Sequence, residues 1–211
     1  LSPYYSLRTS TFVRAALDMK AIGLYIKNKP SLDAVSKKIP LELNQNGITV
    51  THLEDFFIEE NLLLKLQNHS RELLAKAATG RKKTFLKYAW EGKSILDLED
   101  PLTKFALEPK ILEVMAEYLG MWPKFKFHSL AETVPMIEDE ETKGSQRWHR
   151  DPGLRRLCKM FIYLTDVLDE GAGPFIYVRG SHLSGKWEKI FPQELYGREG
   201  IYPPEGEVEK I

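Results

Sequence analysis

The chain has 211 residues, with 30 basic and 30 acidic side chains and 43% hydrophobic residues. This composition excludes disorder and collagen-like structure, and the length favours a single domain over residues 1–211. Balanced charge argues against bulk binding to nucleic acid, and no apolar run approaches the ~20 residues of a membrane helix. The only cysteine, Cys158, excludes an intramolecular disulfide and a multi-cysteine zinc site. Together these features predict a soluble cytoplasmic protein.

Residues 1–120 are predicted to be mainly helical. Apolar residues recur at helical spacing in three stretches, which cover residues 12–26, 62–77 and 109–119. Gly80 and Gly120 are expected to follow the ends of the second and third of these helices. Ser31 is the predicted N-cap of a short segment after Pro30. The turn signal Asn46-Gly47 precedes an alternating stretch, residues 48–53, that predicts a strand.

From residue 121 the apolar period changes to two, which indicates strands. Strands are predicted over residues 124–134, 158–167 and 175–178, with a turn over residues 169–174 between the last two. The acidic run 138–141 is interpreted as a solvated loop in preference to a cation site. Helices first and strands later predict an α+β fold, with the strands forming a sandwich or barrel.

His149 and Asp151 are the candidate metal ligands. Residues two apart in an extended segment project to the same side, so an imidazole nitrogen and a carboxylate oxygen can meet at one point. Two histidines and one carboxylate on one face of the metal are the ligand set of non-haem iron(II) oxygenases. Spacing alone is weak evidence, because His-x-Asp arises by chance in many proteins. His52 and His69 are interpreted as structural.

The residues around this pair resemble the phytanoyl-CoA dioxygenase family. The close resemblance covers residues 145–182 and includes Trp148-His149-Arg150-Asp151, then Gly173-Pro174, then Gly180-Ser181-His182; residues 46–56 resemble the family's entry segment. It implies a double-stranded β-helix (jelly roll) with the N-terminal helices packed outside it. It also implies an enzyme that uses Fe(II), 2-oxoglutarate and O2 to hydroxylate a small-molecule substrate, releasing succinate and CO2.

The resemblance also suggests roles for individual residues. His149 and Asp151 match the family's first two iron ligands, and a carboxylate at position 151 disfavours the halogenase variant. Tyr163 matches an aromatic residue that touches the co-substrate, so we expect it to face the barrel interior. Alternation then places Lys159 inside as well, where it would either bind the 2-oxoglutarate carboxylate or extend to water.

Other residues in the block are assigned no chemistry by the resemblance. Trp148 and Arg150 should point to the other side of their strand and serve packing. His182 is not the family's distal iron ligand, and Arg179 stands where the family usually has Pro.

The family's third ligand, a later histidine, and the arginine that follows it cannot be placed in this sequence. Residues 121–211 would then form the first part of the jelly roll, with its later strands outside this chain. Two classes of function follow: part of a longer oxygenase, or a degenerate and inactive family member that acts as a binding or scaffold module. The oxidised substrate and the oligomeric state are open at this stage.

Overall fold

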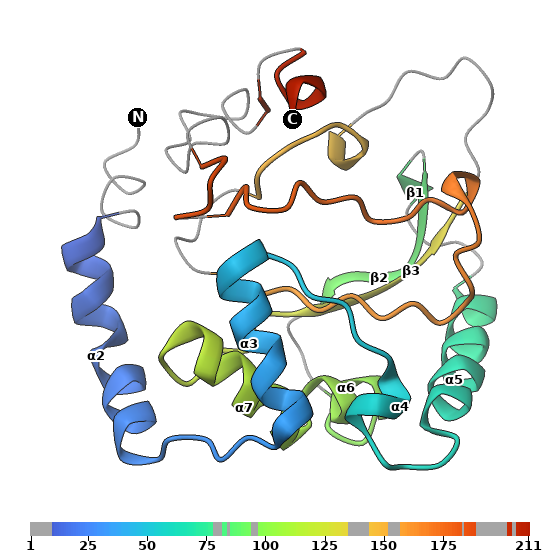
Figure 1. Cartoon of the computed structure of the whole chain (residues 1–211). Coiled ribbons are helices and arrows are strands. Elements are labelled where there is room, and N and C mark those ends of the chain that lie inside the picture. The colour runs from blue at the N-terminus through green and yellow to red at the C-terminus, as the bar shows by residue number, and fades with distance from the viewer. Residues whose placement is uncertain are drawn as a thin grey trace.

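The computed structural model describes residues 10–77, 82–83, 85–93, 97–134, 144–151, 157–182, 184–188, 202–203 and 206–211. Within these ranges the chain combines helices with a small antiparallel sheet, so the predicted α+β class is confirmed (Figure 1). The helices are α2 (Thr11–Lys27), α3 (Ala34–Asn46), α4 (Leu53–Phe56), α5 (Leu62–Lys76), α6 (Pro101–Ala106) and α7 (Pro109–Leu119). The strands are β1 (Lys82–Lys83), β2 (Leu86–Lys93) and β3 (His128–Thr133), and the 3-10 turns are η1 (Gly144–Gln146), η2 (Glu170–Ala172) and η4 (Val208–Lys210).

The three predicted amphipathic helices are confirmed as α2, α5 and α7. Pro109 starts α7, where the first backbone N–H groups of a helix have no partner within it and a missing N–H costs nothing. Gly120 ends the helix with φ +67 and donates its N–H to the Ala116 carbonyl at 2.9 Å. Helix α5 ends at Lys76 with Ala77 as its C-cap, and the predicted Gly80 lies outside the described residues. Helix α6 was not predicted.

The start of α3 differs from the prediction. Asp33, not Ser31, is the N-cap, and its carboxylate accepts the Ser36 N–H at 2.7 Å. The same carboxylate pairs with Lys110 Nζ at 2.8 Å, and Lys110 also donates to the Phe56 carbonyl. The Lys110 and Ser36 hydrogen bonds hold the pKa of Asp33 well below its usual range. Lys110 therefore joins the starts of α3 and α7 to the end of α4. The short segment predicted after Pro30 is a helix of 13 residues.

The sheet has the order β1-β2-β3 with both pairs antiparallel. The pairing of β2 with β3 runs from Leu86 opposite Thr133 to Lys93 opposite His128, with irregularities on both sides of Trp90. β3 confirms a strand within residues 124–134, whereas β1 and β2 lie in the half predicted to be helical and were missed. Residues 48–53 form no strand, because the chain runs from the Gly47 turn into α4.

The strands predicted at residues 158–167 and 175–178 are also wrong in the described structure. Both segments are extended and run side by side in opposite directions (Figure 1), but neither belongs to the sheet. Side-chain contacts hold the first segment instead. Ile162 and Leu164 pack on the helical core, and the Gln67 amide donates to the Leu164 carbonyl at 2.7 Å.

The helical core lies between α3, α4, α5, α6 and α7. Its buried apolar residues are Leu32, Phe56, Leu66, Phe105, Ile111 and Val114. Because Ile162 and Leu164 cover this core, the extended segment that follows the His149 region is fixed to the helices. Among the described helices, none is long and apolar enough to cross a membrane.

Candidate metal-binding site

His149 and Asp151 lie side by side, as the two-residue spacing predicts. His149 Nε2 is 3.8 Å from Asp151 Oδ1, and the two side chains are 24% and 41% exposed. His149 Nδ1 lies 2.7 Å from the Arg147 carbonyl oxygen. A carbonyl only accepts hydrogen bonds, so Nδ1 is the donor in this contact and Nε2 is the nitrogen that faces the carboxylate. A backbone carbonyl that fixes the tautomer in this way is typical of metal-binding histidines.

The donor set of this pair fits a divalent metal. Nε2 and the carboxylate oxygen are both lone-pair donors, and at 3.8 Å they form no hydrogen bond with each other. Ligands at ~2.1 Å from one ion in an octahedral arrangement stand about 3 Å apart, so the pair needs to close by roughly 1 Å. Side-chain rotation of partly exposed residues can supply this movement.

Lys159 reaches the same carboxylate. Its Nζ is 2.5 Å from Asp151 Oδ2, and its side chain is 41% exposed. The predicted alternation of the segment is present, but the face that carries Lys159, Phe161 and Tyr163 is exposed among the described residues, while Ile162 and Leu164 turn toward the core. Lys159 thus has an anionic partner within the site, and its predicted role toward 2-oxoglutarate stays a prediction.

An aromatic row continues from Lys159 across the neighbouring extended segment. Phe161 stacks on Phe175 with ring centroids 4.6 Å apart, and Phe175 is followed by Tyr177 at 6.4 Å. Tyr163 Oη accepts the Phe175 N–H at 2.7 Å, which ties the two segments together without a strand ladder. Tyr163 is half exposed, and contact with a co-substrate also stays a prediction for it.

Among the other histidines, His69 and His182 make polar contacts and His52 is exposed. His69 pairs with Asp100 at 2.7 Å between α5 and the start of α6, and His52 precedes α4. His182 Nε2 donates to the Asn44 carbonyl at 3.0 Å, which agrees with its interpretation as a residue that does not bind the metal. Burial raises the pKa of the Cys158 thiol to about 11, so this thiol is neutral.

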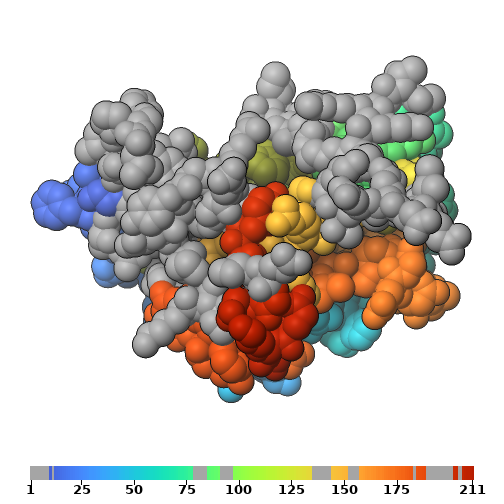
Figure 2. All heavy atoms as spheres, turned by 90° about the horizontal axis from the view of Figure 1, so that it is seen from above, coloured from blue at the N-terminus to red at the C-terminus, as the bar shows by residue number. Residues whose placement is uncertain are grey.

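Two contacts of the His149 segment have no signal in the sequence. The Arg147 carbonyl orients His149, and any residue type could provide it. The Arg147 guanidinium lies 4.3 Å from the centre of the Tyr202 ring, which places residues 202–203 against residues 144–151 (Figure 2).

A third metal ligand is not among the described residues. No group of three His, Cys, Asp or Glu side chains within them could hold a metal ion, and the acidic run 138–141 falls outside the described ranges. An open groove of about 520 Å³, lined by residues such as Asn46, Arg179 and Trp187, contains none of the candidate site residues. We therefore locate the candidate chemistry at the His149–Asp151 pair and not in that groove.

Comparison with protein-family models, with curated proteins and with solved structures gives no match to this chain.

Proposed function

We propose that this protein is a non-haem iron(II)- and 2-oxoglutarate-dependent dioxygenase that hydroxylates a small organic or acyl substrate. The observation that carries the proposal is the His149–Asp151 pair, in which Nδ1 donates to the Arg147 carbonyl and Nε2 lies 3.8 Å from the carboxylate. The proposal includes a jelly-roll core to which the extended segments 157–167 and 173–178 contribute. The sequence resemblance supports it independently of the geometry.

His149 and Asp151 would hold the iron, which with 2-oxoglutarate and O2 supplies the oxidising power for hydroxylation, with succinate and CO2 as co-products. The Arg147 carbonyl accepts from Nδ1 and orients the ring, so that Nε2 is the nitrogen that faces Asp151. The Lys159 ammonium lies next to Asp151, where it could leave that carboxylate for a carboxylate of the co-substrate. Phe161 and Tyr163 extend the same face away from the site and offer an apolar surface to a substrate.

The test is succinate formation from 2-oxoglutarate by the chain loaded with Fe(II) in the absence of substrate. H149A and D151A should each abolish it, because each removes one of the two identified ligands. H52A is the matched control, because His52 is an exposed histidine that precedes α4 and is not a candidate ligand. Full turnover by either ligand variant would refute the assignment.

One observation favours a second candidate, a degenerate family member that acts as a binding or scaffold module. The Lys159 ammonium already neutralises Asp151 at 2.5 Å, which competes with a metal for that carboxylate. For such a module, added Fe(II) or Mn(II) would leave the melting temperature unchanged and no succinate would form. Succinate formation, together with a rise in melting temperature that disappears in D151A, would exclude it.

A further inference from the structure

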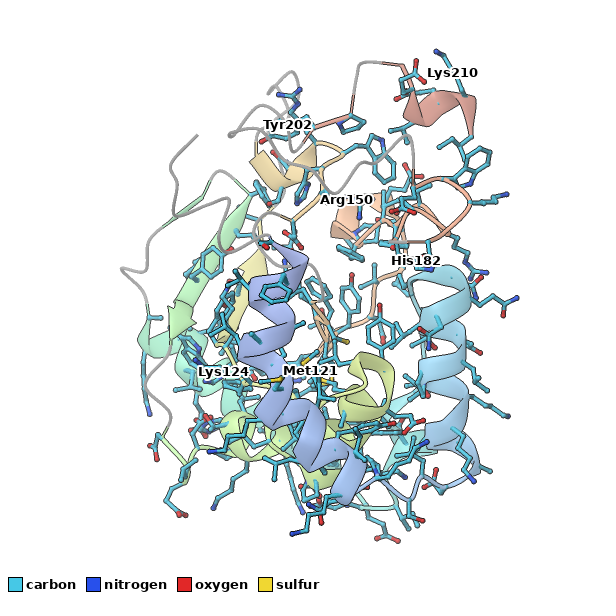
Figure 3. The ribbon with its side chains drawn as sticks, turned by 90° about the vertical axis from the view of Figure 1, so that its left-hand side faces the viewer. Met121, Lys124, Arg150, His182, Tyr202 and Lys210 are labelled. Atoms are coloured by element: carbon cyan, nitrogen blue, oxygen red, sulfur yellow. The ribbon has the colours of Figure 1, made fainter. Side chains whose placement is uncertain are left out.

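We propose that Arg150 is a positioning residue, which anchors the His149–Asp151 segment to the end of helix α3 through the turn of residues 180–182. This inference rests on the proposed function for its chemical meaning, but the anchoring itself can be measured separately. Figure 3 shows Arg150 and His182 near one another above the end of α3.

The turn of residues 180–182 completes the C-terminal end of α3. The last carbonyls of a helix have no partner within the helix and need donors from elsewhere. Gly47 donates to the Leu43 carbonyl at 2.9 Å, His182 Nε2 donates to Asn44 at 3.0 Å, and the Gly180 N–H donates to Asn46 at 2.8 Å. Two of these three donors therefore come from the turn, more than 130 residues later in the chain.

Glycine is required where the turn and the helix meet. Gly47 has φ +76, and a Cβ there would lie 2.3 Å from Tyr177 Oη and 2.7 Å from His182 Nδ1. Gly180 has φ +82 and also accepts the Trp187 N–H on its carbonyl at 2.9 Å. The turn is therefore packed closely against α3 and held from both sides, which makes it a rigid support.

Arg150 connects this support to the candidate site. Its Nη2 donates to the Ser181 carbonyl, and Ser181 is 8% exposed. Burial lowers the pKa of the Arg150 guanidinium, while Tyr177 and Glu188 oppose this shift, so the group is a partly desolvated cation inside the fold. Moving such a group from its acceptor is costly, and its position is accordingly well defined.

Fixing Arg150 fixes its two neighbours. In an extended segment, residue 150 would point to the opposite side from residues 149 and 151. With the guanidinium bonded to Ser181, the backbone on both sides is held, and the two candidate ligands project together on the other side at 3.8 Å. Supporting contacts of this kind commonly change metal affinity by 10- to 100-fold when they are removed.

The experiment uses the full chain and compares R150M with R150K and with the matched control R179M, in which the same change is made at an exposed arginine beside the turn. Hydrogen exchange of a peptide covering residues 147–151 measures the anchoring. Binding of Mn(II) alone, followed by the loss of the free-ion EPR signal, measures positioning. We expect R150M to accelerate exchange and to weaken Mn(II) binding at least about tenfold, R150K to be intermediate, and R179M to match the unmodified chain.

The possible results separate the two claims. Unchanged exchange in R150M overturns the anchoring, and faster exchange with unchanged, Asp151-dependent Mn(II) affinity overturns the positioning role. If the unmodified chain itself binds no Mn(II) in an Asp151-dependent way, the proposed function fails while faster exchange in R150M still supports the anchor.

A second pair of variants tests the α3 end of the connection. H182Q retains a donor for the Asn44 carbonyl and should preserve slow exchange in residues 147–151, whereas H182A should not. Equal exchange in both variants would remove His182 from the support.

Discussion

Replacing Lys159 with methionine distinguishes the roles open to this residue. The ammonium lies 2.5 Å from Asp151 Oδ2, so it can compete with the metal for that carboxylate and can also bind a carboxylate of the co-substrate. Methionine retains most of the aliphatic length and removes the charge. The two roles predict changes in different quantities, namely metal affinity in the first case and the KM for 2-oxoglutarate in the second.

The size of each effect follows from exposure. Both side chains of the Lys159–Asp151 pair are 41% exposed, and an exposed ion pair contributes about 0.2–1 kcal/mol. Releasing Asp151 should therefore strengthen Mn(II) binding by no more than about fivefold. Because the same exposed ammonium would bind the co-substrate carboxylate, its loss should raise the KM for 2-oxoglutarate by a similar factor, up to about fivefold. We expect both changes in K159M.

The assay combines Mn(II) titration without turnover and succinate formation at varied 2-oxoglutarate with Fe(II). K126M is the matched control, because Lys126 is an exposed lysine that lies over the Phe127 ring. If K159M leaves both the metal affinity and the KM at their original values, Lys159 has no role at the site and the reasoning from its contact with Asp151 is wrong.

Two further predictions concern the framework that supports the site. Asp100 is the N-cap of α6, where its carboxylate accepts the Thr103 N–H and pairs with His69. D100A should lower the free energy of unfolding by about 2 kcal/mol. D100N should lower it by about half as much, because asparagine can still cap the helix. Burial of Asp100 opposes ionisation, but the bonds from His69 and Thr103 outweigh it and lower the pKa of Asp100. The stabilisation is therefore present above the ordinary carboxyl pKa and is lost as the pH falls through the lowered pKa of Asp100. In urea unfolding, the difference in unfolding free energy between D100N and the unmodified chain should therefore shrink between pH 7 and pH 3. A constant difference would contradict this. Leu66 is 1% exposed, and L66A should cost about 3 kcal/mol in the same measurement, whereas L64A, at a position 49% exposed in the same helix, should cost under about 0.5 kcal/mol. Similar losses in both would show that α5 does not pack as described.

The helices could be predicted because their signals are local. Apolar spacing and a terminal glycine located α7 almost to the residue, and the same reasoning found α2 and α5. The N-cap of α3 was misplaced because Ser31 and Asp33 are both good capping residues. What selects Asp33 is Lys110, 77 positions later, which pairs with the same carboxylate. No local pattern contains that information.

The strands were harder to predict because alternation reports which side chains are buried, not whether a backbone partner exists. Residues 158–167 alternate as a strand does, but the side turned inward carries Ile162 and Leu164, not Lys159 and Tyr163 as expected. Their inward partner is a group of helices, and the contact with the next segment runs through Tyr163 Oη instead of a ladder. Conversely, β2 was overlooked although it pairs with β3 along most of its length, since its register depends on a strand 35 or more residues away.

The same distinction applies to the candidate site. His149 and Asp151 were predictable as a pair because two-residue spacing alone brings them to one side of an extended chain. Under the proposal above, the position of the pair depends on Arg150, on the Ser181 carbonyl and on the end of α3, which are brought together only by folding. The same proposal gives Gly180-Ser181-His182 a physical reason to accompany Trp148-His149-Arg150-Asp151 in the sequence: one motif carries the candidate ligands, and the other carries the acceptor for Arg150 and the donors that cap α3. A chain could keep His149 and Asp151 and still lose metal binding through a change in the turn, and the Arg150 and His182 variants measure that dependence directly.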